Sequence, residues 1–320
     1  MNEFNIINNY LKDLSIGNKG SFNLTDDIFF DAKKGTAISL DTYVEGIHFL
    51  DSKNPHSFLK KVLRASLSDL YCKGITPKSY FMSLALSKNN ANKKWLNTLK
   101  NILKKEQKKF NITLCGGDIA YSSKFIITIV VLGYSNYKPI LRSTSQINED
   151  IYVTGNIGDS YLGLKIIKKK KNFGKYNDFF IKKYYEPDLA VKISKFLRLF
   201  ASSSIDISDG LLQDLNNICI QSKCGAKINL DLLPFSSQVK YLLKKKKISM
   251  LNMFSKGDDY QILFTSKIKN RRKLESLSKR LGVKLSRIGI TIKGKSIVFN
   301  DKVHKLKIKD KNMGYIHKFS

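Results

Sequence analysis

Long apolar stretches are missing from this chain of 320 residues. The longest apolar runs, such as residues 125–132, fall well short of the roughly 18 residues that a helix needs to cross a bilayer. The first residues, Met1 to Ile6, also lack the basic and then apolar pattern of a secretory signal peptide. We therefore expect a cytoplasmic protein without a membrane partner.

Cysteine is scarce, with 4 residues in the chain, and no two of them have the C-x-x-C spacing of a metal or redox motif. The thiols belong to Cys72, Cys115, Cys219 and Cys224, which lie in apolar or helical sequence contexts. This pattern favours buried free thiols in a reducing compartment over disulfides or a zinc site.

Acidic residues are also few, because 26 Asp and Glu face 57 Lys and Arg and leave a formal net charge of +31. Such a charge suggests nucleic-acid binding. However, only seven of the basic residues are arginines, and the lysine runs 168–171 and 244–247 contain no aromatic side chain or arginine that could stack on or read bases. We therefore favour a lysine-rich surface without a specific nucleic-acid partner, while non-specific binding of polyanions at low salt remains open.

The apolar pattern predicts a chain that alternates strands and helices. A hydrophobic content of 42 % is that of a globular protein, and 320 residues leave room for two cores. Helices are expected at 58–73, 92–110, 160–167 and 211–222. Strands are expected at 36–40, 80–86, 111–115, 124–133, 150–154, 203–206, 226–230 and 260–265. The pattern changes near residues 137–143, so we predict an α+β (mixed α/β) fold with domains at 1–138 and 139–320.

Despite their scarcity, acids recur near the ends of the apolar segments. They stand in Thr25–Asp27, Ser39–Asp41, Leu67–Asp69, Gly116–Asp118, Ile205–Gly210 and Lys256–Tyr260. A single Asp of this kind usually caps a helix or forms a turn. Several carboxylates gathered in one cleft repel one another, however, and persist there only when cations neutralise them. Because no pair of Cys or His accompanies these acids, oxygen ligation favours Mg²⁺, which often bridges to substrate phosphates.

Glycines next to these acids indicate backbone that can approach an anion. In residues 115–118, a turn with two glycines could cradle a phosphate with its N–H groups. In residues 206–210, an apolar strand runs into the helix expected at 211–222, so Ser208 and Asp209 stand at the positive end of that helix. Plain helix capping explains this second segment equally well.

The motifs, taken in their order, are similar to those of a known family. In chain order they read SLDTYVEGIHF, LSDLYCKGI, CGGD, LRS, VTGNIGDS, IDISDGLLQDL, KGDDYQILF and the final GYIHKF. By these motifs the chain resembles the thiamine-monophosphate kinase family, which belongs to the superfamily of aminoimidazole ribonucleotide synthetase and selenophosphate synthetase. It runs from about Asp26 to Phe319, which is nearly the whole chain.

The resemblance implies a two-domain fold like that of aminoimidazole ribonucleotide synthetase. The N-terminal domain would bind ATP and metal and form a homodimer through its sheet, and the C-terminal domain would complete the nucleotide and substrate sites. The implied reaction moves the γ-phosphoryl group of ATP onto thiamine monophosphate, with several Mg²⁺ ions, and yields thiamine diphosphate and ADP. Because the acceptor phosphate is already ionised, positioning and charge neutralisation can carry the rate without a general base.

Matching this sequence to the motifs of the family implies roles for individual residues. The implied metal ligands are Asp27, Ser39, Asp41, Asp69, Asp118, Asp206 and Asp209. The implied ATP contacts are Gly117, Asp118, Arg142 and Ser208. The implied catalytic residues are Asp118, Arg142 and Asp209. The implied substrate contacts are His48, Asp258 and Tyr315.

Four segments depart from the family pattern. Residues 23–27 read NLTDD where the family has G-x-G-D-D, Leu40 replaces a threonine, residues 119–121 replace a segment that often contains an arginine, and Asp258 replaces a glutamate. A catalytically weakened member that acts as a basic binding protein therefore remains an alternative. A selenophosphate synthetase is a further alternative, but residues 1–30 lack the reactive cysteine that such an enzyme needs.

Overall fold

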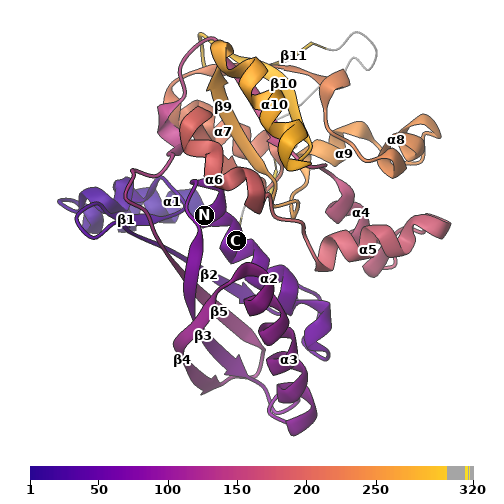
Figure 1. Ribbon diagram of the computed structural model, residues 1–320. Coiled ribbons are helices and arrows are strands. Elements are labelled where there is room, and N and C mark those ends of the chain that lie inside the picture. The colour runs from indigo at the N-terminus through magenta and orange to yellow at the C-terminus, as the bar shows by residue number, and fades with distance from the viewer. Residues whose placement is uncertain (301–313, 316, 318–320) are drawn as a thin grey trace.

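The computed structural model describes residues 1–300, 314, 315 and 317, and it contains one sheet in each half of the chain (Figure 1). The N-terminal half forms a five-stranded sheet in the order β1-β2-β5-β3-β4. Its strands are β1 (Phe29–Asp31), β2 (Thr36–Val44), β3 (Pro77–Leu86), β4 (Thr113–Tyr121) and β5 (Ile126–Tyr134). Neighbouring strands are antiparallel except β3 and β4, which a helical crossover connects in parallel.

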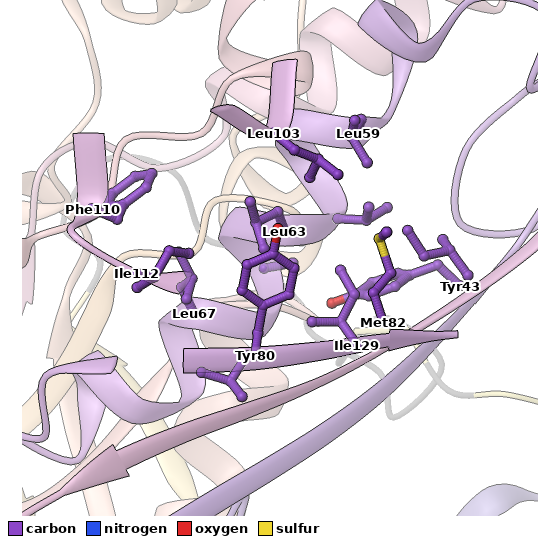
Figure 2. Packing of buried hydrophobic residues seen from close by; sticks show 14 of the residues in the cluster. Tyr43, Leu59, Leu63, Leu67, Tyr80, Met82, Leu103, Phe110, Ile112 and Ile129 are labelled. Carbon is purple, nitrogen blue, oxygen red and sulfur yellow. The ribbon is translucent and has the colours of Figure 1, made fainter. Parts of the chain in front are cut away.

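Two helices, α2 (Leu59–Cys72) and α3 (Lys93–Phe110), lie against one side of this sheet (Figure 1). The side chain of Asn92 accepts a hydrogen bond from the N–H of Trp95 and so begins α3, and the left-handed backbone of Asn111 ends it. The apolar side chains of both helices recur at helical spacing and face the sheet. Figure 2 shows the resulting core, with Leu63, Leu67, Tyr80, Met82 and Ile129 among its members.

The opposite face of the N-terminal sheet is much more exposed. The side chain of Leu40 on β2 is 64 % exposed, and that of Phe81 on β3 is 39 % exposed. Between them lie the half-buried Val130 and Leu132 of β5. This face is therefore an apolar surface without a complete cover in the described part of the chain.

The C-terminal half forms a six-stranded sheet in the order β11-β8-β10-β6-β9-β7. Its strands are β6 (Glu149–Thr154), β7 (Ala201–Asp206), β8 (Gly225–Asn229), β9 (Ile262–Lys267), β10 (Leu285–Ile292) and β11 (Ile297–Asn300). Its helices are α4 (Asp159–Ile167), α5 (Asn177–Tyr185), α6 (Val191–Phe200), α7 (Leu211–Ser222), α8 (Ser237–Lys244), α9 (Met250–Ser255) and α10 (Arg271–Leu281). Neighbouring strands are antiparallel except the parallel pair β8 and β11. No helix among the described residues is long and apolar enough to span a bilayer.

Helix α2 lies between the two halves and is buried on nearly all of its sides. Hydrogen bonds to backbone carbonyl groups connect α2 with the C-terminal half in both directions. Arg64 donates a hydrogen bond to the carbonyl oxygen of Pro187 at 3.1 Å, and the hydroxyl of Ser194 donates to the carbonyl oxygen of Tyr71 at 2.6 Å. Polar side chains that project from α2 are therefore enclosed by both halves of the protein.

The predicted α+β architecture with mixed sheets is confirmed. The predicted boundary between residues 138 and 139 falls between the two sheets, but its exact position stays a prediction. Several strands are longer than expected, most of all β2, which continues to Val44, and β4, which continues to Tyr121. The expected glycine turn at residues 116–118 is therefore wrong, since these residues run alongside β3.

The close approach of β4 to β3 explains why residue 117 is a glycine. A Cβ atom on Gly117 would come within 1.8 Å of the carbonyl oxygen of Met82 on β3. Any larger residue would thus force β4 away from its neighbour. A structural role accounts for Gly117 without a ligand, and its implied contact with ATP stays a prediction.

Candidate active site

Three acids meet where β2, α2 and β7 come together, and we call Asp41, Asp69 and Asp206 the acid cluster. Asp206 is buried and the other two are half-buried. Asp41 lies on β2, Asp69 lies in the last turn of α2, and Asp206 ends β7. The hydroxyl of Tyr43 donates a hydrogen bond to Asp41 at 3.0 Å, and the hydroxyl of Ser39 donates one to Asp69. Ser39, Asp41 and Tyr43 all lie on β2. Because side chains alternate along a strand, all three face α2. The structure thus brings together four of the implied metal ligands.

The acid cluster carries more negative charge than its surroundings neutralise. Burial raises the pKa of all three carboxyl groups. Repulsion from Asp206 further raises the pKa of Asp41, and repulsion from Asp41 and Asp206 further raises the pKa of Asp69. Within the described residues, none of the three forms an ion pair. Oxygen donors with an excess of negative charge fit a hard divalent cation such as Mg²⁺.

A second group of acids lies next to the acid cluster, and cations neutralise it. Lys73, which follows α2, places its ammonium 2.6 Å from Asp26 Oδ1 and 2.8 Å from Asp27 Oδ2. The guanidinium of Arg142 pairs with Asp27, and the backbone N–H of Arg142 donates to Asp26 at 2.8 Å. A carboxylate oxygen of Asp27 lies within 4.8 Å of one of Asp206. Asp27 and Arg142 are therefore neighbours of the acid cluster.

The cysteines in the structure are free thiols, three of them buried, whereas Cys115 is exposed and differs from the expectation. The sulfur of Cys72 lies within 4.8 Å of carboxylate oxygens of Asp27 and Asp206. Burial raises the pKa of the Cys72 thiol well above its ordinary value. This neutral thiol adds no charge to the site, so oxygen remains the dominant donor.

The segment before α7 adds a further acid to the site. Burial, with repulsion from Glu3 and Asp206, raises the pKa of Asp209 to about 7. Asp214 accepts hydrogen bonds from the N–H groups of Asp209 and Gly210 at 3.2 and 3.1 Å and so fixes the turn. Sequence reasoning missed Asp214, although its position five residues after Asp209 in IDISDGLLQDL was a usable signal.

A buried lysine connects two of the implied substrate contacts. The ammonium of Lys61 on α2 lies 2.8 Å from Asp258 Oδ1 and donates a hydrogen bond to the carbonyl oxygen of His48 at 3.0 Å. It also lies 4.1 Å from the ring centroid of Tyr184. Sequence reasoning missed Lys61 and Tyr184. The local sequence contains no signal for Lys61, because it stands on the side of the helix opposite the apolar positions 59, 62, 63, 67 and 70.

Aromatic rings connect the same region to the C-terminal segment, and we call His48, His317 and Tyr315 the ring cluster. The ring centroids of His48 and His317 are 5.3 Å apart, and those of His317 and Tyr315 are 4.9 Å apart. The N–H of Tyr315 donates to the carbonyl oxygen of Asp209 at 3.2 Å. Tyr43, which binds Asp41, lies 5.7 Å from His48 between ring centroids. The ring cluster thus adjoins the acid cluster.

Asp118 lies apart from the other implied metal ligands within this chain. The strand register aligns Thr42, Thr128, Ser83 and Asp118 in one row across β2, β5, β3 and β4. This row spans three strand spacings, or about 14 Å, and its side chains point to the opposite face from Asp41. The implied roles of Asp118 in metal binding and catalysis therefore stay predictions.

The segment that replaces the family's glycines contains left-handed backbone, although Thr25, at the second glycine position, does not share it. Phe22, Asn23 and Leu24 have φ angles of 50°, 54° and 56°, in the left-handed region. Side chains other than glycine disfavour this conformation, so the loop before Asp27 is strained. Leu40, at the position of the family's threonine, points to the exposed face of the sheet.

A cavity of about 520 Å³ lies in another region, between the end of α3 and the start of α4. Its lining includes Lys109, Asp159, Ser160, Lys183 and Asp259. None of the implied site residues lines this cavity. The candidate chemistry therefore belongs to the acid cluster and the ring cluster.

Comparison with known proteins identifies the family. Residues 25–135 match the family model described as AIR synthase related protein, N-terminal domain, and residues 148–302 match its C-terminal domain. A thiamine-monophosphate kinase of Buchnera aphidicola is 35 % identical over 99 % of this chain and 98 % of its own length.

Two solved structures share the fold. A thiamine monophosphate kinase from Aquifex aeolicus has a TM-score of 0.80 and 24 % identity over 93 % of this chain and 96 % of its own. The structure described as AaThiL complexed with AMPPCP and TMP has a TM-score of 0.80 and 23 % identity over 99 % of this chain and 97 % of its own. With the family models and the identity to the Buchnera protein, the conclusion is that this chain belongs to the thiamine-monophosphate kinase family of AIR synthase related proteins.

Proposed function

We propose that this protein transfers the γ-phosphoryl group of ATP to the phosphate of thiamine monophosphate and so makes thiamine diphosphate. The observation that carries this function is the adjacency of the acid cluster and the ring cluster, which Tyr43 touches on both sides. An acid cluster suits metal-bound phosphates, and rings beside a carboxylate suit a flat cationic group such as a thiazolium. The related AaThiL structure holds AMPPCP and TMP, which agrees with this pair of reactants.

The acid cluster would hold Mg²⁺ between the two negatively charged reactants. Bound Mg²⁺ supplies charge neutralisation and alignment of the phosphoryl group with its acceptor. Asp41, Asp69 and Asp206 offer the carboxylate oxygens, while the hydroxyl groups of Ser39 and Ser68 fix the orientation of Asp69 and Asp206. Because the acceptor phosphate is already ionised, no side chain has to remove a proton.

Arg142 and Ser208 are suited to bind the phosphates of ATP. The guanidinium of Arg142 uses Nε and Nη2 on Asp27, which leaves the Nη1 N–H groups for an anion. The backbone carbonyl of Ser208 accepts from the N–H of Asp258 at 2.8 Å, and this bond ties the nucleotide side of the site to its substrate side. These contacts support the proposed roles of Arg142 and Ser208 on the nucleotide side of the site.

His48 is suited to donate a hydrogen bond to the substrate as a neutral imidazole. Burial, with the neighbouring His317 and Lys61, lowers the pKa of His48, so the ring is uncharged at neutral pH. Its Nδ1 accepts from the N–H of Val44 at 3.0 Å, and the ring proton therefore resides on Nε2. An Nε2–H group can orient a polar atom of thiamine monophosphate without adding charge.

A homodimer through the N-terminal sheet is part of the proposal. The exposed face of that sheet is apolar, with Leu40, Phe81, Val130 and Leu132 on adjacent strands. Exposed apolar faces of this kind mark interaction surfaces. A second copy would cover these residues and would also approach Asp118, which lies on the same face.

The test is to incubate the purified chain with ATP, Mg²⁺ and thiamine monophosphate and to measure thiamine diphosphate and ADP. Equal amounts of both products, formed only with Mg²⁺, are expected. Salt-resistant binding of RNA without any nucleotide turnover would instead favour a basic binding protein on an inactive kinase fold. Turnover of ATP without thiamine diphosphate would contradict the proposed acceptor.

A further inference from the structure

Lys73 is buried in the middle of the candidate site, unlike the lysines of the surface. The residue is 1 % exposed and directly follows α2. Its ammonium lies 2.6 Å from Asp26 Oδ1, 2.8 Å from Asp27 Oδ2 and 2.9 Å from the carbonyl oxygen of Ser204. An ammonium has three N–H donors, so each of them has a partner. Lys73 is therefore a built part of the site and is held from both halves of the chain.

The charges around the site divide into two parts. Asp26 and Asp27 carry two negative charges, and Lys73 and Arg142 place two positive charges beside them. No cation pairs with the acid cluster in the described part of the chain. Because an uncompensated buried charge costs several kcal/mol, the first part needs no metal to balance its charge, whereas the three carboxyl groups of the acid cluster can all ionise only when a metal ion neutralises them.

We propose that Lys73 is a built-in cation whose ammonium holds the place between Asp26 and Asp27 that a divalent ion would occupy in its absence. Divalent ions would then bind at the acid cluster. Asp27 would lie beside these ions while it remains paired with the ammonium of Lys73. This inference rests on the proposed metal role of the acid cluster. Without the ammonium, the first part of the site has an excess negative charge and attracts a further ion.

The direct test counts Mn²⁺ ions bound per chain, by equilibrium dialysis and electron paramagnetic resonance, with AMPPCP present. Lys73→Met is expected to bind about one more Mn²⁺ than the natural chain, because neutralising the lysine frees two carboxylates. Lys73→Arg keeps the charge and is expected to match the natural chain. Equal counts for Lys73→Met and the natural chain would overturn the inference. A natural chain that binds no Mn²⁺ would instead overturn the proposed function.

Thermal unfolding gives a second readout that does not depend on counting. Lys73→Met is expected to melt at a lower temperature without metal and to gain more from Mg²⁺ than the natural chain gains. Lys61→Met is the matched control, because it also removes a buried ammonium from an Asp, but next to the ring cluster. Lys61→Met should also melt at a lower temperature than the natural chain, but Mg²⁺ should not reduce that difference. If Lys73→Met folds only with divalent ions the inference is supported, and if it folds equally poorly with and without them the inference is wrong.

Discussion

The three acids of the acid cluster lower the stability of the metal-free protein, and the proposed metal binding explains their presence. Asp41, Asp69 and Asp206 come from three separate elements, yet burial raises the pKa of each, and repulsion within the cluster adds to the rise at Asp41 and Asp69. A protein keeps such an arrangement only where it serves function, because neutral side chains would be more stable there. Substitution in this cluster should therefore change activity and stability in opposite directions.

Asp69→Asn should show these opposite changes of activity and stability most clearly. The amide removes a repelling charge but can still accept a hydrogen bond from Ser39. We expect the metal-free protein to gain about 1 kcal/mol or more in its free energy of unfolding, and turnover to fall at least about 100-fold. Chemical denaturation with a chelator and the product assay measure the two effects. The exposed Asp231→Asn is the control, and a stable variant with normal turnover would contradict the metal role.

The raised pKa of Asp209 predicts that the stability of the folded protein depends on pH. Its pKa is raised from 3.8 to about 7, so the folded state keeps a proton that the unfolded state has lost. Its contribution to stability is fully present below about pH 4 and is lost as pH rises to about 7, at about 1.4 kcal/mol per pH unit. Asp209→Asn lacks this loss. In metal-free unfolding experiments, the variant should gain on the natural chain across this range, and a constant difference would contradict the assignment.

The acids of the site could be predicted from the sequence, but the buried lysines could not. Asp41, Asp69 and Asp206 stand out because acids are rare and follow apolar segments. Lys61 and Lys73 are hidden among many surface lysines, and only the enclosure of α2 by both halves shows that they are buried. Local patterns contain no information on such long-range enclosure.

At the scale of elements, α2 organises the site. Lys61, near its start, serves the ring cluster, whereas Asp69, near its end, belongs to the acid cluster. Its periodicity predicted a helix with one apolar stripe, and the helix exists within the expected range. The extent of β4 was not predictable in this way, because two glycines favour a turn locally while pairing with β3 imposes a strand.

Gly117→Ala tests whether strand packing or a ligand requires this glycine. The new methyl group would lie 1.8 Å from the carbonyl oxygen of Met82, so β4 must move away from β3. We expect a loss of about 2 kcal/mol or more in the free energy of unfolding, measured by denaturation without ligands. Gly116→Ala meets only the ring of Phe81 at 3.0 Å and should lose much less. Equal stability of the two variants would speak against strand packing.

At the scale of the whole molecule, the ordered motifs predicted the family and fold class, whereas the enclosure of α2 and the exposed face of the N-terminal sheet emerged only from the structure. Several of these motifs contribute residues to one shared site, among them those with Asp41, Asp69 and Asp206. Surface charge follows no such constraint, and the net charge of +31 therefore says little about the reaction. The proposed homodimer would form through the apolar face of the N-terminal sheet.

Leu40→Asp tests the proposed homodimer. Leu40 is 64 % exposed at the centre of β2, and a charge there would be buried without a partner in a sheet-to-sheet dimer. We expect the natural chain to sediment as a dimer and the variant to shift to monomer by at least about tenfold in dissociation constant. Leu96→Asp on α3 is the matched control at another exposed leucine. A natural chain that sediments as a monomer at all concentrations would rule out this interface.

The central claim is that the acid cluster, loaded with Mg²⁺, carries phosphoryl transfer to thiamine monophosphate. The most direct measurement compares the formation of thiamine diphosphate by the natural chain and by Asp206→Asn, each with ATP over a titration of Mg²⁺. We expect equal amounts of thiamine diphosphate and ADP from the natural chain and a loss of at least about 100-fold in the folded variant. Turnover by Asp206→Asn at the natural rate and the natural Mg²⁺ requirement would contradict the central claim.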